Sequence, residues 1–223
     1  SNVGVSNIAT DLGGDTLRNL YARLGLGQAT GIGFPGEAVG VLPAPPKWRP
    51  VEESTLSYGY GMSVNALQLA QAYMVIANGG VRYPLSLMKQ EQRPQGQRVL
   101  SEQVTRAVRD MLKQAVARGT GKRAQPGLYA AGGKTGTVHL VGANGYEDSQ
   151  YKAIFAGMAP IDDPRIVTVV AVDAPQAGEY YGGEVAAPVF ARVMGDALRL
   201  LNVKPELEVS ETRVSQVTSG GRG

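Results

Sequence analysis

Hydrophobic residues recur at helical spacing in four segments of the chain, and the first two segments lie in its N-terminal half. The first predicts a helix that Asp15 or Thr16 caps and that ends at Gly25. The second, residues 65–77, is apolar almost all round, which is typical of a buried helix, and we expect Ser63 to cap it. The inward face of the first helix would consist of Leu17, Leu20, Tyr21 and Leu24.

Two more helices are predicted in the C-terminal half. Ser101 caps an amphipathic helix, and residues 187–201 predict the last one, whose first turn accommodates Pro188. Residues 29–53 are rich in glycine and proline, so we expect an ordered loop there. The inward face of the helix after Ser101 would consist of Val104, Val108, Met111, Leu112 and Ala115.

Strand-like runs follow one another between these last two helices. They are the segment around Lys134, residues 152–159 and residues 165–173. The run 166–172 is β-branched and almost unbroken, which predicts a central strand buried on both faces. We therefore expect a mixed α/β (α+β) fold over residues 1–204, while the polar residues 205–223 predict a disordered tail.

Composition narrows the class of protein without identifying it. The 223 residues are 43% hydrophobic with a net charge of +3 and no cysteine, which is enough to bury a core and excludes disulfides. The charge is spread rather than clustered, so nothing indicates a nucleic-acid-binding surface. No His, Asp or Glu cluster has the spacing of metal ligands, and no apolar stretch reaches the roughly 18–20 residues of a membrane span. We predict no metal and no cofactor.

The tetrapeptide Lys134-Thr135-Gly136-Thr137 carries the clearest chemistry. A lysine, two hydroxyls and a glycine on one strand edge can bind an anion. The ammonium supplies charge, the hydroxyls donate hydrogen bonds, and the glycine allows close approach of a ligand to the backbone. Lys-Thr-Gly is also one of three signatures of serine penicillin-binding proteins and β-lactamases.

Four longer blocks, together with this motif, resemble the transpeptidase domain of class B penicillin-binding proteins, in particular the division-specific type of Gram-negative bacteria. The resemblance extends from Ser1 to about Pro205 and implies a serine β-lactamase-like fold, with an antiparallel sheet packed by helices. The blocks are residues 56–70, 119–124, 155–160 and 180–189.

The resemblance implies a peptidoglycan D,D-transpeptidase that forms cross-links through a serine acyl-enzyme during septal cell-wall synthesis. Peptidoglycan stem peptides ending in D-Ala-D-Ala would be its substrates and β-lactam antibiotics its inhibitors. A lipid II glycosyltransferase and divisome proteins would be its partners. The domain would be periplasmic, held by an inner-membrane anchor outside this sequence. Lys134, Thr137 and Asn2 would be catalytic, and Thr135, Gly136, Tyr60, Tyr180 and Tyr181 would bind the substrate.

The serine nucleophile of a Ser-x-x-Lys motif lies, in this family, upstream of a Ser-x-Asn motif. The chain opens at Ser1-Asn2, which resembles the end of a Ser-Ser-Asn version of that second motif. We therefore expect the nucleophile to precede Ser1. The chain by itself should be inactive and poorly folded, because the apolar helix 65–77 would be exposed.

Two Ser-x-x-Lys strings do occur, at Ser86–Lys89 and Ser149–Lys152. We interpret both as chance matches in extended or loop segments, because residues three apart in a strand point to opposite faces.

His139, the only histidine, is expected at the rim of the cleft or in solvent. Two other functions stay open: a DD-carboxypeptidase or β-lactamase-like hydrolase, and a non-catalytic penicillin-binding module.

Overall fold

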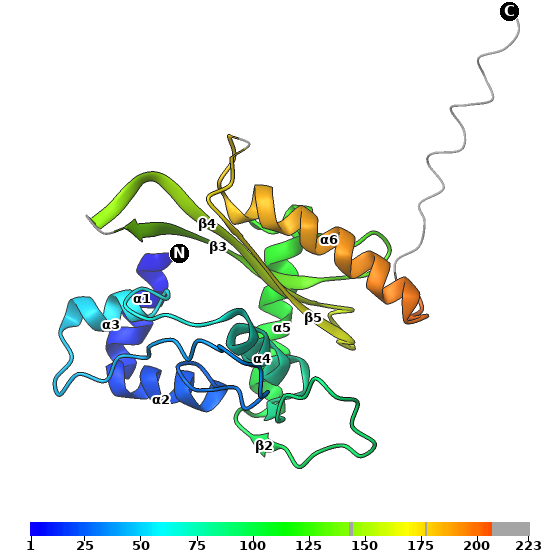
Figure 1. Cartoon of the computed structure of the whole chain (residues 1–223), viewed down its shortest axis with the longest axis horizontal. Helices are drawn as coiled ribbons and strands as arrows, with labels where there is room; N and C mark the ends of the chain where they lie inside the picture. The colour runs from blue at the N-terminus through cyan, green and yellow to red at the C-terminus, as the bar shows by residue number, and fades with distance from the viewer. Residues whose placement is uncertain (143–144, 177, 207–223) are drawn as a thin grey trace, which may run out of the picture.

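A computed structural model describes residues 1–142, 145–176 and 178–206, with the side chains of these residues except 141–149. Figure 1 shows a sheet crossed by helix α6, with the helices of the N-terminal half below it in this view. In chain order the elements are α1 (Asn2–Leu12), α2 (Gly14–Leu24), α3 (Pro50–Leu56), α4 (Ala66–Ala77), β1 (Val81–Arg82), β2 (Gln97–Arg98), α5 (Glu102–Ala117), η1 (Lys122–Ala124), β3 (Gly132–Gly142), β4 (Gly145–Ala159), β5 (Ile166–Asp173) and α6 (Gly182–Leu200).

The three predicted strands are present as β3, β4 and β5, which form an antiparallel sheet in that order. The prediction of a central strand at 166–172 is wrong, because β4 is the central strand and β5 is an outer one within the described residues. Most of β5 is only half-buried. A run of β-branched residues indicates that the faces of a strand pack against other side chains, but it does not indicate how many strands flank that strand.

The core lies between the sheet and α6. Phe155 of β4 and Phe190 of α6 are fully buried, with ring centroids 4.7 Å apart, and Val116 at the end of α5 joins the same cluster. Successive strand residues point to opposite faces, so the buried Met158 faces the other side of β4. Helix α4 contacts β4 and β5 as well, so the central strand is covered on both faces.

Helix α4 is a buried helix, as predicted, but part of its buried face is polar. Gln68 is 0% exposed, and its amide nitrogen donates to the carbonyl oxygens of Gln28 at 2.5 Å and Val39 at 2.6 Å. Asn65 caps the helix by accepting from the Gln68 backbone N–H, and Gln68 in turn accepts from the Asn65 backbone N–H. Gln68 therefore ties α4 to the loop that precedes it.

The prediction that Ser63 caps α4 is wrong. Ser63 exchanges two backbone hydrogen bonds with Val41 in an isolated bridge, at 2.8 and 2.9 Å. The bridge places Ser63 two residues before the cap, and Asn65 offers the amide oxygen that the first turn requires.

Helix α2 also begins without the predicted cap. Gly13 is the N-cap, with no side-chain hydrogen bond, and the Gly14 N–H donates to the Glu53 carboxylate at 3.0 Å instead. Asp15 accepts from the Trp48 indole N–H at 2.8 Å. The acidic residue is thus engaged by a tertiary contact, which local sequence rules do not include. The predicted stop at Gly25 is confirmed by its left-handed backbone, with φ of 100°.

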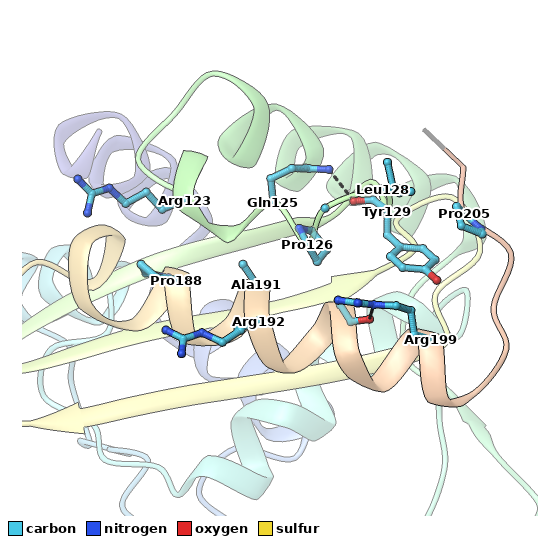
Figure 2. A pocket seen from close by; sticks show the side chains of 12 residues that line it. Arg123, Gln125, Pro126, Leu128, Tyr129, Pro188, Ala191, Arg192, Arg199 and Pro205 are labelled. Atoms are coloured by element: carbon cyan, nitrogen blue, oxygen red, sulfur yellow. Dashed lines mark hydrogen bonds between the residues drawn. The ribbon is translucent and has the colours of Figure 1, made fainter. Parts of the chain in front are cut away.

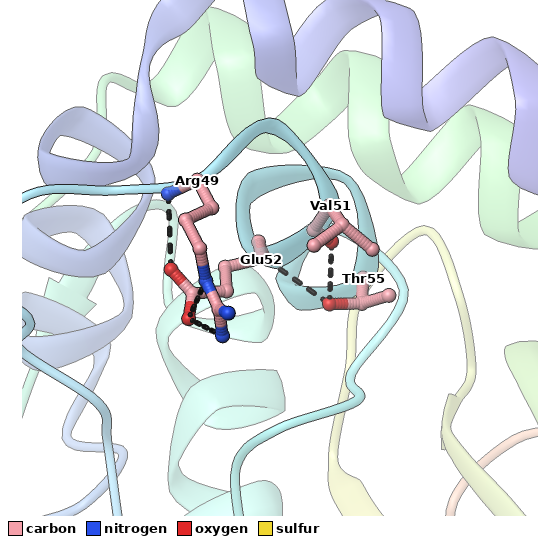
Figure 3. A network of polar contacts seen from close by, with 4 residues as sticks. All are labelled: Arg49, Val51, Glu52 and Thr55. Carbon is pink, nitrogen blue, oxygen red and sulfur yellow. Dashed lines mark hydrogen bonds and ion pairs between the residues drawn. The ribbon is translucent and has the colours of Figure 1, made fainter.

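Helix α3 lies partly within the segment that the glycine and proline content predicts as a loop. Pro50 occupies its first position, and the Glu52 carboxylate accepts from the Arg49 backbone N–H at 3.0 Å and from its guanidinium (Figure 3). The hydrogen bond from the Arg49 side chain is the main cause that lowers the pKa of Glu52. Pro and Glu in these positions are typical of a helix start, so the signal was present in the sequence.

Helix α5 is capped by Ser101 as predicted, but its buried stripe is rotated. Thr105 and Val116 are buried, whereas Val104 and Met111 are 46% and 66% exposed.

Helix α6 begins at Gly182, five residues before the predicted start, so Pro188 lies in its second turn. Proline is disfavoured there because it lacks an N–H, which is why the sequence suggests a later start.

Of the predicted tail, only Pro205 and Glu206 are described, and residues 207–223 lie outside the described part. The Glu206 backbone N–H donates to the Leu128 carbonyl oxygen at 3.1 Å, and its carboxylate accepts from the Ala130 N–H at 3.1 Å. Within the described ranges, no helix combines the length and the apolar character needed to cross a membrane.

We expect Gln68→Leu to lower the free energy of unfolding by about 2–3 kcal/mol, because it removes the buried amide that bonds to backbone groups of Asn65, Gln28 and Val39. Gln71→Leu is the matched control. Gln71 is also buried, but one of its amide atoms already lacks a partner, so we expect a smaller loss. Urea unfolding of both variants of the full-length protein measures the difference, and equal losses would contradict this role of Gln68.

Candidate active site

The Lys134–Thr137 tetrapeptide lies on β3, an outer strand of the sheet. Lys134 is exposed, and its ammonium bends back to donate to the Thr135 carbonyl oxygen at 3.0 Å and the Thr135 hydroxyl at 3.3 Å. The Thr135 hydroxyl also meets the Thr120 hydroxyl at 2.8 Å. Strand alternation alone would separate Lys134 from Thr135, but the long lysine side chain reaches around the strand edge.

Helix α6 begins directly against this strand. The Gly182 backbone N–H donates to the Thr137 hydroxyl at 3.1 Å. A side chain at Gly182 would collide with the carbonyl oxygens of Gly136 and Ile154, and one at Gly183 with that of Thr120. The glycines therefore let the helix N-terminus, with its partial positive charge, reach β3. Gly182 and Gly183 are the first two residues of α6.

An aromatic row borders the junction of α6 and β3. Tyr180 stacks on Tyr151 with ring centroids 4.0 Å apart, Tyr181 lies 4.4 Å from Tyr180, and His139 meets Tyr151 edge-on at 4.2 Å. The Tyr180 hydroxyl donates to the Tyr181 hydroxyl at 3.1 Å, and this hydrogen bond is the main cause that raises the pKa of Tyr180 to about 12. Tyr180 is therefore a neutral phenol near neutral pH.

Sequence reasoning finds Tyr180 and Tyr181 but misses Tyr151. Tyr151 pairs with His139 across β3 and β4, and paired residues of neighbouring strands share one face. The face of the sheet on which Tyr151 lies relative to β3 can be predicted only once this register is known. The sequence alone therefore does not place Tyr151 beside His139.

Asn2 and Tyr60 are not joined to the tetrapeptide by any hydrogen bond among the described residues. Asn2 is the exposed first residue of α1, whose N-cap is Ser1. Tyr60 meets Tyr58 edge-on at 5.7 Å and lines a separate hollow with Trp48 and Leu56. The catalytic role of Asn2 and the substrate-binding role of Tyr60 stay predictions.

Among the described side chains, neither Lys89 nor Lys152 is paired with a serine. The Ser86 hydroxyl donates to the Met88 carbonyl oxygen at 2.8 Å and accepts from the Met88 N–H at 3.0 Å, in a local turn. Ser149 and Lys152 both lie within β4 rather than in a loop. The Lys152 ammonium forms an ion pair with Asp173 at 2.9 Å, so its charge is engaged on β5.

Both threonine hydroxyls of the tetrapeptide already accept a hydrogen bond from a group that can only donate. Thr135 accepts from the Lys134 ammonium, and Thr137 accepts from the Gly182 N–H. Each hydroxyl can therefore direct its own proton to an acceptor at the strand edge. Glu184, in the first turn of α6, is paired with Arg123 at 2.7 Å, which offsets its negative charge. The arrangement favours binding of a carboxylate.

A cavity of about 610 Å³ lies elsewhere, along the side of α6 (Figure 2). None of the predicted site residues lines it. We call it the α6 groove. No group of three or more His, Asp or Glu side chains in the described part of the chain could hold a metal ion. The α6 groove is lined by Arg123, Gln125, Pro126, Gly127, Leu128, Tyr129, Pro188, Ala191, Arg192, Gly195, Arg199 and Pro205.

Comparison with known proteins identifies relatives of this chain. Residues 1–195 match the family model described as the penicillin binding protein transpeptidase domain. The chain is 40% identical to the peptidoglycan D,D-transpeptidase FtsI of Escherichia coli strain K12 over 224 residues, which covers 100% of this chain and 38% of that protein. It is 39% identical to the probable peptidoglycan D,D-transpeptidase PenA of Neisseria gonorrhoeae, covering 92% of this chain and 36% of that protein.

A solved structure is similar as well. The TP domain of Burkholderia pseudomallei penicillin-binding protein 3 superposes with a TM-score of 0.88 at 44% identity, covering 93% of this chain and 64% of that chain. The predicted fold family is confirmed by this similarity. The chain spans well under half the length of its curated relatives FtsI and PenA.

We expect Gly182→Ala to disrupt the junction, because the added methyl group would overlap the carbonyl oxygens of Gly136 and Ile154. Overpacking of this kind typically costs about 1–3 kcal/mol of folding stability. Gly4→Ala, in the first turn of α1, is the matched control, since its nearest neighbour would be 3.9 Å away. Thermal unfolding compares the two variants, and a Gly182→Ala protein as stable as the control would show that the junction tolerates a side chain.

Proposed function

The chain belongs to the family of penicillin-binding protein transpeptidase domains, and on this premise we propose that the protein containing it is a peptidoglycan D,D-transpeptidase. The observation that carries the proposal is the edge of β3, where two hydroxyls, an ammonium and a helix N-terminus converge on one place. The donor stem peptide ends in a D-alanine carboxylate, which is the group that this edge favours.

The proposed reaction is acyl transfer through a serine ester. A serine hydroxyl attacks the carbonyl carbon between the two D-alanines, the C–N bond breaks, and the proton passes to the leaving amine as D-alanine departs. The amine of a second stem peptide then attacks the ester, which forms the cross-link and restores the serine hydroxyl. A β-lactam acylates the same serine by opening its ring, so it has no leaving group to release.

Each residue of the tetrapeptide has a place in this scheme. Thr135 and Thr137 bind the terminal carboxylate with their free hydroxyl protons, and Gly136 keeps the strand open to the peptide. The Thr137 backbone N–H donates to the developing oxyanion, a contact commonly worth about 3 kcal/mol of barrier. Lys134 supplies the positive field that assists proton transfer at the serine. Asn2 donates to the amide of the acyl chain.

We place the nucleophile and its lysine partner in a part of the parent protein that precedes Ser1. The order of motifs in the family supports this placement. The local turn that holds the Ser86 hydroxyl and the ion pair that engages Lys152 support it too, because they argue against the two serines within the chain.

We further propose that the parent protein acts in septal cell-wall synthesis and that this domain is periplasmic, beside a membrane anchor outside the chain. A lipid II glycosyltransferase and divisome proteins would be its partners, and β-lactams its inhibitors. The similarity to enzymes named FtsI supports this setting. Tyr151, Tyr180 and Tyr181 offer flat apolar surface with polar tips, which suits contact with a stem peptide or a drug side chain.

Labelling of the full-length protein with a fluorescent penicillin, followed by mass spectrometry of the adduct, tests the reaction. We expect one adduct, on a serine that precedes Ser1, and the same yield in a Ser86→Ala variant. Residues 1–223 alone should not be labelled. An adduct on Ser86 or Ser149 would show that the proposed position of the nucleophile is wrong. No adduct at all would contradict the proposed function.

We expect Thr120→Val to slow acylation by a penicillin about tenfold, because Thr135 loses the hydroxyl that orients it, and tenfold corresponds to about 1.4 kcal/mol. Thr120→Ser should keep most of the rate. The methyl ester of the same penicillin, which lacks the carboxylate charge, should react with Thr120→Val and the unmodified protein at similar rates. Equal slowing of acid and ester would indicate a general structural effect instead.

A further inference from the structure

The α6 groove has a charged wall that the proposed reaction does not use. One side of it is a stripe of α6 at residues 188, 191, 192, 195 and 199, and the facing side is the segment 123–129 (Figure 2). These positions follow helical spacing, so they form one face of α6. Phe190 points to the core from the same helix, so the groove and the core lie on different sides of it.

Three arginines and no acidic residue line the α6 groove. Arg123 and Arg199 are paired with Glu184 at 2.7 Å and Asp196 at 2.9 Å, and all four side chains are at least 37% exposed. Arg192 is exposed and has no acidic partner among the described residues. An exposed ion pair contributes at most about 1 kcal/mol to stability. Carboxylates from another molecule can therefore replace Glu184 and Asp196 at little cost in free energy.

The shape of the α6 groove suits a chain in extended conformation. Pro188 and Arg199 are eleven residues apart on α6, which is about 16 Å along the helix axis, or roughly five residues of extended peptide. Arg192 and Arg199 lie two turns apart on one side, about 10 Å from each other along the axis. That span corresponds to about three residues of an extended chain.

The floor of the groove between these arginines is apolar. Pro126, Leu128, Tyr129 and Ala191 contribute to it, and Gly195 lies close to Pro126, because an added Cβ would be in van der Waals contact with the Pro126 carbonyl oxygen at 3.6 Å. An apolar side chain fits such a floor while its neighbours reach the guanidinium groups above. A flat membrane surface would not reach the floor of a concave groove, so lipid headgroups suit it less well.

We propose that the α6 groove binds an acidic segment of a partner protein in the polyproline II conformation, in which side chains three residues apart lie on the same side, about 9 Å from each other. The segment has two carboxylates three residues apart and an apolar side chain between them. Arg192 binds one carboxylate and Arg199 the other. The apolar side chain packs against Tyr129 and Pro126. This inference does not depend on the proposed reaction, because the groove contains none of the residues assigned to it.

Fluorescence polarisation with the full-length protein tests the proposal. The probe is a fluorescein-labelled peptide, Pro-Glu-Leu-Pro-Glu-Val, and the control peptide has glutamine in place of both glutamates. We expect Arg192→Glu to weaken binding at least tenfold and Gly195→Leu, which fills the floor, at least fivefold. Arg106→Glu is an equal charge reversal at an exposed position of α5 and should change the affinity less than twofold. Penicillin labelling and thermal unfolding check that each variant is folded.

Four results would overturn the proposal. One is absence of binding to the unmodified protein, and another is an equal loss in Arg106→Glu, which would indicate diffuse charge attraction. A third is Arg192-dependent binding to vesicles of phosphatidylglycerol and phosphatidylcholine at 1:3 without binding of the peptide. The fourth is at least tenfold tighter peptide binding after removal of residues 207–223, which would assign the groove to the protein's own C-terminal residues.

Discussion

The N-terminus of α6 can lie directly against β3 only because no side chain stands between the two backbones, and Gly182 and Gly183 meet this requirement. Their contact with β3 places a backbone N–H 3.1 Å from the Thr137 hydroxyl. A methyl group at either glycine would meet a carbonyl oxygen. The register of β3 against β4 pairs Gly136 with Ile154, the two residues whose carbonyl oxygens lie against Gly182. The candidate active site therefore depends on two residues that have no functional group.

The functional groups of the site are arranged so that protons remain available to a ligand. The Lys134 ammonium and the Gly182 amide can only donate, so the two threonine hydroxyls accept from them without using their own protons. In the 2.8 Å contact between Thr135 and Thr120, either hydroxyl can be the donor. A preorganised donor costs no reorientation when the ligand arrives. The same helix serves three purposes on different sides: its N-terminus meets β3, one side packs on Phe155, and another side forms the α6 groove.

The sequence predicts much of this molecule, and its failures share one cause. Patterns within one element identify the three strands, the buried helix α4, the Ser101 cap and the place of the Lys134–Thr137 tetrapeptide on a strand. Errors occur where a contact between distant segments decides the outcome. The bridge to Val41 leaves the cap of α4 to Asn65 instead of Ser63. Within the described residues, β5 lies at an edge of the sheet although its composition suits a centre, and Tyr151 joins the site only through strand register. The family resemblance also implies roles for Asn2 and Tyr60. No hydrogen bond among the described residues joins either of them to the tetrapeptide, so these roles stay predictions.

A crystal structure of the full-length protein acylated by a penicillin would show directly which groups hold the carboxylate. We expect the penicillin carboxylate to lie about 2.7 Å from both the Thr135 and Thr137 hydroxyls, with the Gly182 N–H still bonded to Thr137. The acylated serine should precede Ser1. A carboxylate held by other residues, with the two threonine hydroxyls turned away from it, would contradict the proposed role of the junction between α6 and β3.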